Sequence, residues 1–495
     1  MESSCSFHCQ ENCKYTDVVV IGNGPSGICM SYLLSGHRPY FSGEHHSNPL
    51  LHSKLKQIPS KDSVVEQDLE YLCEGLEGRS TNPVALLFDA LSHPDADLGS
   101  ELPSLLTWKK EEQAISHVIF GKYKPGGAWQ NMDGSMQTLS QSNWMELPTV
   151  TFREWLTTKK RTEGVFQNRA TISEVRSYYE DFVKVKELTS NFCNEHVVTS
   201  VQKVFQTRNG VDSESGEVLP CCKNVSKNHP FLWEVRGYKL SGKEMSDNQN
   251  GNVQREEFCF AAPHVILATG TYDIPNKVGT PGENLPHVLH SLSEFEKVMM
   301  NNSLYNKSSP LLIIGSGLSA ADAVLMADEY NIPVIHVFRC SPNDSSLIFK
   351  KLPQGMYEEY HKVHALMKGK LSHPLYKPYK KHNVVEFKDD QKVLLESIDG
   401  NVITSLDISY ALVLVGSRPD LSFLPQDGQN LGHLKRFPID SKHNPIDIDP
   451  YTHQCNRELG LFAMGPLVGD NFVRFAIGGS LAIANHLIRK NKKET

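Results

Sequence analysis

Two short runs of apolar residues each lead into a glycine-rich turn and then into a small-residue, apolar stretch that favours a helix. The first run is Val18 to Ile21, and the second is Leu311 to Ile314. Continuous apolar runs of this length are typical of strands buried in a parallel sheet. The pattern therefore predicts two strand-turn-helix units, far apart in one chain.

The first turn has the spacing G-x-G-x-x-G, which is typical of dinucleotide binding. We expect Gly22 to allow the tight turn, Gly24 to let the backbone approach a pyrophosphate, and Gly27 to let the helix pack on the strand. The phosphates would lie at the positive helix N-terminus, beside Pro25 and Ser26. This turn predicts a first dinucleotide site.

An acid about 20 residues after such a turn, at the end of the next strand, commonly holds a ribose hydroxyl. Glu44 has this spacing and follows the candidate strand 38–42. We therefore expect Glu44 to bind the ribose of the first dinucleotide, which indicates FAD. The alternative interpretation of Glu44 is an acid in a surface loop.

The second turn is the variant G-x-G-x-x-A, with Gly315, Gly317 and Ala320, and Leu318 begins its helix. The apolar run that follows ends in Arg339 rather than in an acid. A guanidinium can bind a 2′-phosphate through two hydrogen bonds, whereas a carboxylate would repel it. The second turn therefore predicts NADPH binding, unless Arg339 is an ordinary surface cation.

Two further segments are expected to mark where the chain leaves the first domain and returns to it. Residues 264–270 form an apolar run that ends in Thr269 and Gly270, and residues 411–419 form another that contains Gly416. Together they bracket the second turn. The predicted fold is α/β, with two Rossmann-like dinucleotide-binding domains and the NADP domain inserted in the FAD domain.

Two segments carry candidate contacts to a flavin ring. Gly126 and Gly127 would let the backbone approach the ring, and Trp129 could cover it, although a loop with a core tryptophan is the alternative. Near the C-terminus, a helix of small residues could direct its positive end toward the flavin. The candidate contacts before that helix are Gly465, Asn471 and Phe472.

Length and composition limit the possible functions. A chain of 495 residues suggests at least two domains, and a net charge of −7 gives no electrostatic reason to bind nucleic acid. No apolar run approaches the roughly 18 residues of a membrane span, and residues 1–15 lack the apolar core of a secretory signal. We expect an intracellular, cytoplasmic protein.

The eleven cysteines are scattered, and the sequence contains no C-x-x-C pair. This argues against a disulfide scaffold and for a reducing compartment. Cys5, His8, Cys9 and Cys13 have a spacing that could bind zinc, but they lie in a polar terminal tail without a second ligand pair. We therefore expect a disordered tail and no metal site.

The motifs and composition predict the following domain organisation. Residues 1–15 are a disordered tail. Residues 16–300 are the first part of the FAD domain, with a helical insertion at 45–120 and a mobile excursion at 206–255. The NADP domain is 301–420, and 421–490 return to the FAD domain.

The order of these motifs resembles that of class B flavin monooxygenases. Longer strings, at 69–80, 134–136, 144–148 and 465–475, resemble the oxidative-stress-induced growth inhibitor proteins, and the likeness extends from Asp17 to Ile488. The resemblance implies FAD and NADPH binding, monooxygenase activity, and a role in growth, differentiation and cell death under oxidative stress. It leaves open the substrate, which is a small molecule or a protein, and it allows regulatory protein partners.

The implied mechanism is hydride transfer from NADPH to FAD, O2 activation at the flavin C4a carbon, and transfer of one oxygen atom. The sequence departs from the F-x-G-x-x-x-H signature, of which only His290 remains. The asparagine that flavin-containing monooxygenases place after the glycine-tryptophan segment is absent, and Ser140 and Gln141 lie in its neighbourhood. These three residues are weak catalytic candidates, and His290 is alternatively a hydrogen-bonded linker histidine.

Two other functions are compatible with the motifs. One is an uncoupled NADPH oxidase that releases H2O2, and the other is a non-catalytic scaffold that senses NADPH. A disulfide reductase is disfavoured, because the chain lacks a C-x-x-C pair.

Overall fold

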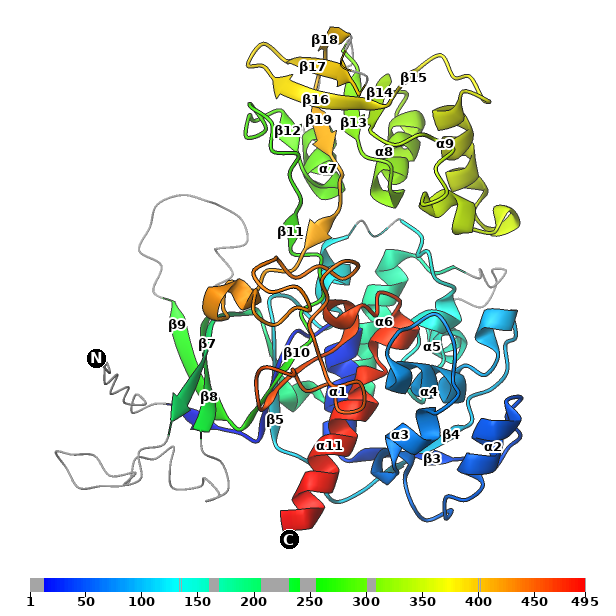
Figure 1. The fold of residues 1–495 in the computed structure, drawn as a ribbon, viewed down its shortest axis with the longest axis vertical. Helices are drawn as coiled ribbons and strands as arrows, with labels where there is room; N and C mark the ends of the chain where they lie inside the picture. Colours follow the sequence, from blue (N-terminus) through cyan, green and yellow to red (C-terminus); the bar gives the residue numbers. More distant parts are fainter. Residues whose placement is uncertain are drawn as a thin grey trace, which may run out of the picture. The chain divides into compact units, whose positions relative to one another are not determined.

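The computed structural model describes residues 13–132, 134, 136–159, 169–205, 231–240, 255–300, 309–398, 400 and 402–494. The chain forms two compact units (Figure 1). Unit 1 contains the chain up to Thr271 and again from Pro419, and unit 2 is Tyr272–Arg418. The first boundary follows the glycine-containing segment 264–270, and the second falls near the end of the segment 411–419, the two segments that we interpreted as crossings. Unit 2 thus begins earlier than the predicted start at position 301.

The central sheet of unit 1 has five parallel strands. Their order is β21 (Leu461–Ala463), β10 (His264–Leu267), β2 (Val18–Ile21), β5 (His117–Gly121) and β6 (Phe192–Asn194). All four residues of β2 are buried, as expected for a strand covered on both faces.

Alternate residues of β2 belong to different cores. Val18 and Val20 pack with the helices, whereas Val19 and Ile21 pack with a second, antiparallel sheet. That sheet has the order β1 (Lys14–Tyr15), β9 (Glu256–Ala262), β8 (Phe231–Lys239) and β7 (His196–Phe205), with β1 parallel to β9. Unit 1 is therefore layered as helices, parallel sheet and antiparallel sheet.

The helical layer contains α1, which follows the first turn, and α11, which packs beside it (Figure 1). The α-helices of unit 1 are α1 (Pro25–Leu34), α2 (Pro49–Leu55), α3 (Leu69–Cys73), α4 (Pro83–Ser92), α5 (Phe152–Thr158), α6 (Ile172–Val185), α10 (Val473–Ala476) and α11 (Gly479–Glu494). Its 3-10 helices are η1 (Val64–Glu66), η2 (Ala96–Leu98), η3 (Gly127–Asn131), η4 (Ser142–Met145), η5 (Thr189–Asn191), η9 (Pro425–Gly428) and η10 (Gly465–Val468).

The predicted helical insertion at 45–120 is partly wrong. Residues 49–92 do contain α2, α3 and α4, but residues 106–110 form β4, which pairs antiparallel with β3 (His37–Phe41). Residues 117–120 belong to β5 in the central sheet. The insertion therefore ends before β5, because the apolar run from His117 is a buried strand rather than part of a helix.

The predicted disordered tail and the predicted mobile excursion each contain a strand. Lys14 and Tyr15 form β1 at the edge of β9, so the tail is ordered before position 15. Residues 231–239 form β8 inside the predicted excursion at 206–255. The remaining parts of that excursion, and Cys5, His8 and Cys9, lie outside the described residues.

Unit 2 repeats the same layering around a second parallel sheet. Its order is β12 (Val288–Leu289), β19 (Ala411–Val413), β13 (Leu311–Ile314), β14 (Val334–Phe338) and β15 (Tyr376–Lys380). An antiparallel sheet of β16 (His382–Phe387), β17 (Lys392–Ser397) and β18 (Ile403–Asp407) shares a core with it. The remaining elements are β11 (Ile274–Pro275), β20 (Ser417–Arg418), α7 (Leu292–Met300), α8 (Leu318–Glu329), α9 (Glu358–Lys368), η7 (Ile348–Lys351) and η8 (Gln354–Met356).

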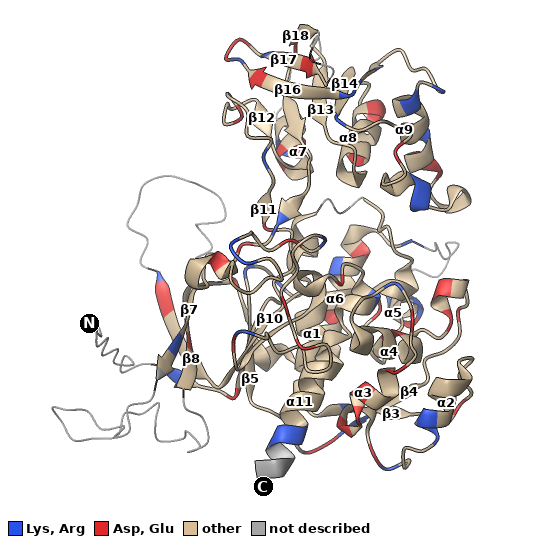
Figure 2. Ribbon diagram, in the orientation of Figure 1, with Lys and Arg blue, Asp and Glu red and all other residues tan. Residues whose placement is uncertain are grey.

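Acidic and basic residues are interspersed along the ribbons of both units (Figure 2). Within the described residues, no helix is long and apolar enough to cross a bilayer.

Candidate functional site

The first glycine turn is closed by two close backbone contacts. Gly22 has φ +115°, and a β-carbon there would collide with the carbonyl of Ala268. A β-carbon on Gly27 would collide with the carbonyl of Gly22. Both positions therefore require glycine, for the tight turn and for the packing of α1 that we predicted.

Gly24, between these two, has open space where a side chain would stand. The nearest atom to a β-carbon there is the carbonyl oxygen of Gly126, at 3.9 Å. Gly24 is the N-cap of α1, no side chain caps that end, and the first turn of the helix contains no acid. The amides at this helix end are thus available to an anionic ligand, which is the arrangement that a pyrophosphate requires.

The segment with Gly126 and Gly127 lies against this turn. The amide of Gly126 donates to the carbonyl of Asn23 at 2.8 Å, and a β-carbon on Gly127 would lie 3.0 Å from the α-carbon of Gly24. The structure thus brings together two glycine segments about a hundred residues apart. Trp129 follows in η3, and its carbonyl accepts from Arg176 Nε at 2.7 Å.

Gly465 approaches the same helix from the C-terminal segment. It has φ +69°, and a β-carbon there would lie 2.8 Å from Ser26 Oγ. Ser26 Oγ donates to the carbonyl of Ala476 at 2.9 Å. Asn471 and Phe472 follow as exposed residues before α10. Their predicted contact with a flavin stays a prediction.

Thr269 and Gly270 complete the surroundings of the first turn. The hydroxyl of Thr269 is buried and has no hydrogen-bond partner, and open space surrounds Gly270 on its side-chain side. A buried hydroxyl without a partner beside an open helix N-terminus is what a missing polar ligand would leave. The first turn therefore fits a dinucleotide.

The prediction for Glu44 rests on a wrong premise. The strand before it, β3, pairs antiparallel with β4 and is not part of the parallel sheet. The strand that follows α1 in that sheet is β5, which ends at Gly121 and is followed by Lys122, so neither position carries an acid. The spacing rule assumes that the next strand in sequence is also next in the sheet, and here an insertion separates the two.

Asn23 is a residue of this site that the sequence analysis missed. Its amide donates to the carbonyl of Tyr123 at 2.6 Å and to Asn194 Oδ1 at 3.0 Å. A β-carbon on Gly121 would collide with the Asn23 side chain. Asn23 thus ties the turn to the ends of β5 and β6, and no sequence signal connects these distant positions.

The second turn has the same construction within unit 2. Gly315 has φ +141°, and a β-carbon there would collide with the carbonyl of Leu414. Gly317 is the uncapped N-cap of α8, with no atom within 4 Å of a β-carbon. The first turn of α8, which begins at Leu318, contains no acid. Ala320 packs against Gly315, where the first turn has Gly27.

His336 of β14 supports this second turn and was not predicted. Its Nε2 lies 2.8 Å from the carbonyl of Gly315, and its Nδ1 lies 2.7 Å from Tyr376 Oη. Burial lowers the pKa of His336 to about 4, so the ring is neutral near pH 7. The neutral ring donates from Nε2 to the turn and accepts from the tyrosine hydroxyl.

Arg339 follows β14 directly and is exposed. β14 lies beside β13 in the parallel sheet and follows α8, so Arg339 has the position that the sequence analysis assumed. Gly416 has φ +93° and lies near Asn276, whose amide donates to the carbonyl of Val415. The second turn fits a dinucleotide by the same open N-cap as the first.

The three weak catalytic candidates make contacts with neighbouring protein groups. The carbonyl of Ser140 accepts from Thr138 Oγ1 at 2.7 Å, and Gln141 is the N-cap of η4. His290 Nε2 lies 3.2 Å from Glu283 Oε1 inside unit 2. His290 therefore fits the alternative of a hydrogen-bonded linker histidine.

A buried charge cluster joins the insertion to the C-terminal segment. Arg474 is 1% exposed, and its Nη2 donates to Asp89 Oδ2 at 2.9 Å and to Asp97 Oδ1 at 2.8 Å. Arg474 Nε also lies 2.8 Å from Asp89 Oδ1, so the two side chains form an ion pair. The guanidinium also covers the ring of Trp144, 4.5 Å from its centroid.

A second buried link lies nearby. Asp470 accepts hydrogen bonds from Ser80 Oγ and from Asn82 Nδ2 at 2.8 Å. Burial raises the pKa of Asp470 to about 7, although these two hydrogen bonds oppose the shift. The strings at 69–80, 144–148 and 465–475, which carried the family resemblance, thus contribute to one packed region.

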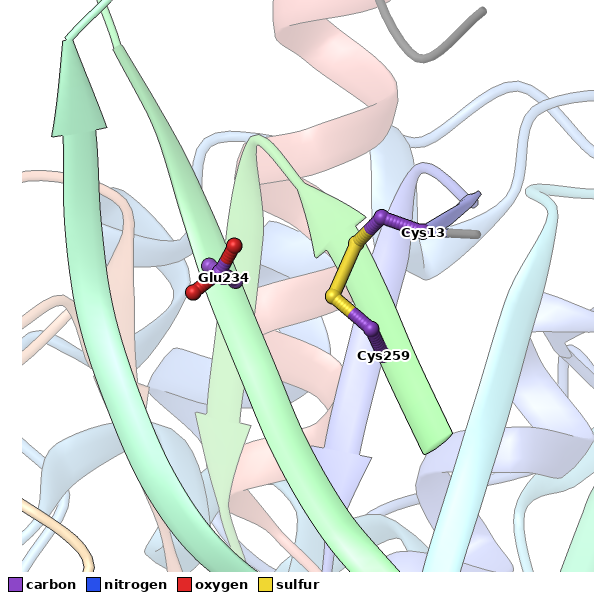
Figure 3. A group of neighbouring side chains, drawn as sticks. All are labelled: Cys13, Glu234 and Cys259. Carbon is purple, nitrogen blue, oxygen red and sulfur yellow. A yellow bond between two sulfur atoms is a disulfide. The ribbon is translucent and has the colours of Figure 1, made fainter. Parts of the chain in front are cut away.

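The structure contains a disulfide that the sequence analysis did not predict. Cys13 is bonded to Cys259, across β1 and β9. The two sulfur atoms and a carboxylate oxygen of Glu234 lie within 4.8 Å of one another (Figure 3). The covalent bond uses both sulfurs, so this group does not form a metal site in the structure.

Comparisons with known proteins decide the family. Oxidative stress-induced growth inhibitor 2 of Homo sapiens is 46% identical over 490 residues, which cover 96% of this chain and 94% of the relative. The chain belongs to the oxidative stress-induced growth inhibitor family. This confirms the resemblance found in the sequence.

The fold comparisons agree with the two turns. The family described as pyridine nucleotide-disulphide oxidoreductase matches residues 244–444. Bacillithiol disulfide reductase Bdr of Bacillus cereus has a TM-score of 0.57 at 15% identity, covering 96% of this chain and 100% of its own. Ornithine hydroxylase PvdA of Pseudomonas aeruginosa has a TM-score of 0.57 at 11% identity, covering 96% and 99%. This growth inhibitor homologue therefore has the predicted fold of FAD- and NAD(P)-binding flavoproteins.

Proposed function

We propose that this growth inhibitor family member is an NADPH-dependent flavoprotein oxidoreductase of the monooxygenase type. In this proposal FAD binds at the turn of unit 1 and NADPH at the turn of unit 2. An oxygen atom from O2 is transferred to a substrate, and the activity serves growth control under oxidative stress, as the relatives' names suggest.

One observation carries the proposal: the chain builds the same open turn twice. In each unit the first glycine is fixed against a carbonyl of the neighbouring strand, and the middle glycine, Gly24 or Gly317, is an uncapped helix N-cap facing open space. A single turn of this kind would fit a nucleotide-binding module. Two of them in a flavoprotein fold support electron transfer between two dinucleotides.

The residues around the first turn of unit 1 would hold FAD. The amides at the start of α1 would bind the pyrophosphate, and the hydroxyl of Thr269 would gain the partner that it lacks. Gly465 keeps the C-terminal segment within reach of α1. Among the described cysteines, Cys13 and Cys259 are bonded to each other, and they come before the parallel strands β2 and β10 in the chain. The first glycine turn comes after β2, at the other end of these strands. The disulfide is therefore not a redox pair beside the flavin.

The residues of unit 2 would select the reductant. Arg339 would bind the 2′-phosphate of NADPH, and His336 would keep the turn in shape through the carbonyl of Gly315. When bound, the two cofactors supply the redox chemistry, in which a hydride passes from the nicotinamide to the flavin. The name of PvdA as a hydroxylase shows that this fold is compatible with a monooxygenase, and the missing C-x-x-C pair disfavours a disulfide reductase.

The deciding experiment is spectroscopic. The purified full-length protein is expected to show a flavin absorption band that bleaches when NADPH is added without oxygen. Arg339→Ala should raise the KM for NADPH at least tenfold and change the KM for NADH little. Lys370→Ala, which removes an exposed cation that follows the end of α9, should change neither. A colourless protein that neither takes up FAD nor oxidises NADPH would refute the proposal.

The same preparation tests the monooxygenase step. With oxygen present and a candidate substrate supplied, coupled turnover consumes NADPH without releasing an equal amount of H2O2. Equal amounts of H2O2 and NADPH with every substrate would instead identify an uncoupled NADPH oxidase.

A further inference from the structure

The Cys13–Cys259 disulfide lies between the shortest strand of unit 1 and its neighbour. The register pairs Lys14 with Phe260 and Tyr15 with Ala261, which places Cys13 opposite Cys259. Their α-carbons are 4.6 Å apart, although 246 residues separate them in sequence. The bond therefore closes a very large loop at the edge of a sheet.

Few other contacts hold β1 on β9. Its pairing covers two residues, the amide of Thr16 donates to the carbonyl of Ala261 at 3.1 Å, and the Lys14 ammonium lies 5.9 Å from the centre of the Phe260 ring. Pairing this short is weak by itself, because each backbone hydrogen bond contributes little net stability. The disulfide is thus the covalent link between β1 and β9, whereas at its other end β1 continues after two residues into β2 of the central sheet.

The disulfide is accessible to small molecules. Cys13 and Cys259 are both partly exposed. Cys259, Lys14 and Arg236 line one cavity of about 810 Å³, whose wall also includes the free cysteine Cys193. A thiolate must reach a sulfur atom for exchange, and this cavity provides the space that a low-molecular-weight thiol requires.

The remaining described cysteines favour a reversible bond over a structural scaffold. Five are free: Cys29, Cys73, Cys193, Cys340 and Cys455. Of these, Cys29, Cys73 and Cys455 are buried and therefore shielded. Proteins that depend on disulfides usually pair their cysteines, whereas in cytosolic proteins, where small thiols keep cysteines reduced, a disulfide is usually transient, catalytic or redox-sensing.

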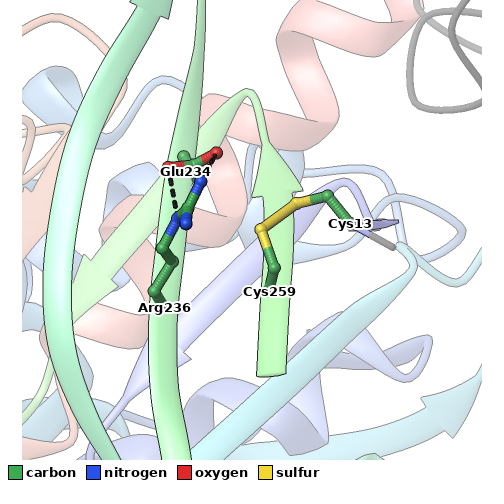
Figure 4. The surroundings of a disulfide bond; sticks show 4 residues. All are labelled: Cys13, Glu234, Arg236 and Cys259. Carbon is green, nitrogen blue, oxygen red and sulfur yellow. Dashed lines mark hydrogen bonds and ion pairs between the residues drawn. A yellow bond between two sulfur atoms is a disulfide. The ribbon is translucent and has the colours of Figure 1, made fainter. Parts of the chain in front are cut away.

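The charges around the sulfurs argue against a metal in the reduced state. Arg236 lies opposite Cys259 in the β8–β9 register, and it holds Glu234 through Nε at 2.7 Å and Nη2 at 3.0 Å (Figure 4). A cation bound by the two sulfurs and Glu234 would have to compete with this guanidinium. The local charges therefore suit a neutral dithiol or a disulfide better than a metal.

We propose that Cys13 and Cys259 form a reversible redox site that a low-molecular-weight thiol such as glutathione opens and its disulfide closes. Opening breaks the Cys13–Cys259 bond and consumes two thiol molecules through a mixed disulfide; it yields two protein thiols and one molecule of the small disulfide. Closing is the reverse reaction. Opening frees β1 from the edge of β9, so the covalent bond controls whether this edge is covered.

The chemical test uses the purified full-length protein in buffers with graded ratios of glutathione to glutathione disulfide. After acid quenching and alkylation, peptide mass spectrometry measures the Cys13–Cys259-linked peptide. We expect the linked peptide at the oxidising end, its loss toward the reducing end, and its return on re-oxidation. Separate alkylation of both cysteines in glutathione disulfide, or a link that persists at every ratio, would overturn the proposal.

The structural test uses hydrogen exchange of the wild-type protein. Reduction should raise the exchange of residues 14–16, and Cys259→Ser should exchange like the reduced wild type in both buffers. Cys193→Ser is the matched control, because Cys193 borders the same cavity without being bonded, and it should keep the wild-type response. Equal exchange of residues 14–16 in both wild-type states, or loss of the response in Cys193→Ser, would contradict the proposal.

Discussion

The carbonyl of Ala268 fills the space in which a side chain of Gly22 would stand, and Leu414 has the same relationship to Gly315 in the other unit. Ala268 and Leu414 also donate in the same way, each amide to the last residue of the strand before the turn, at 2.8 Å. Because these contacts are equivalent, the two turns are one structural solution used twice. These close contacts also distinguish the glycines that the fold requires from the glycines that a bound ligand would require.

Gly22→Ala should destabilise unit 1, whereas Gly24→Ala should not. The first substitution adds a β-carbon at φ +115° against a fixed carbonyl, and such strain costs about 1–3 kcal/mol or more. Gly24 has extended backbone, with φ −72° and ψ −175°, and open space. Urea unfolding of both variants measures the difference, and equal free energies of unfolding would contradict this reading of the turn.

Gly24→Val and Gly317→Val should fold normally and lose cofactor. A valine at either position fits the extended backbone but would occupy the space through which a pyrophosphate approaches the helix N-terminus. We expect loss of the flavin band in the first variant and at least tenfold weaker NADPH binding in the second. Gly355→Val is the control, because Gly355 also has open space but belongs to η8 and not to a glycine turn.

The two turns could be predicted from sequence because a strand, three spaced glycines and a helix are contiguous. The division of the chain into two units was also predictable, since an apolar run that ends in a glycine stands on each side of the second turn in the sequence. Glu44 shows the limit of this reasoning. It has the right spacing, but β3 leaves the parallel sheet to pair with β4, and only strand pairing across an insertion reveals that β5 takes the expected place.

The supporting residues could not be predicted, because each depends on partners far away in sequence. The amide of Asn23 forms hydrogen bonds with Tyr123 and Asn194. His336 forms a hydrogen bond with the carbonyl of Gly315, a backbone group that has no sequence signature. The disulfide joins Cys13 to Cys259, and scattered cysteines give no sign of their pairing. Such contacts follow from the packed fold, not from local pattern.

His336 should make unit 2 less stable in acid. Burial lowers its pKa to about 4, whereas the unfolded chain binds the proton near 6.5, so lowering the pH between these values favours unfolding. The stability lost to His336→Gln should therefore be largest at pH 7 and smaller at pH 5, by about 2 kcal/mol at most. Urea unfolding at both pH values tests this, with His443→Gln as the control because 83% of that side chain is exposed. A cost that is independent of pH would contradict the prediction.

Arg474→Ala should be among the most destabilising single changes in unit 1. It would leave the buried carboxylate of Asp89 without its guanidinium partner, and breaking a buried pair from one side costs about 3–5 kcal/mol. The double variant Asp89→Leu with Arg474→Met should recover much of this loss, because it removes both charges and keeps apolar volume. Arg79→Ala is the matched control: Arg79 lies 3.7 Å from Asp97 but is 48% exposed, so its loss should cost less than about 1 kcal/mol. Denaturant unfolding would contradict the role of this cluster if Arg474→Ala cost no more than Arg79→Ala.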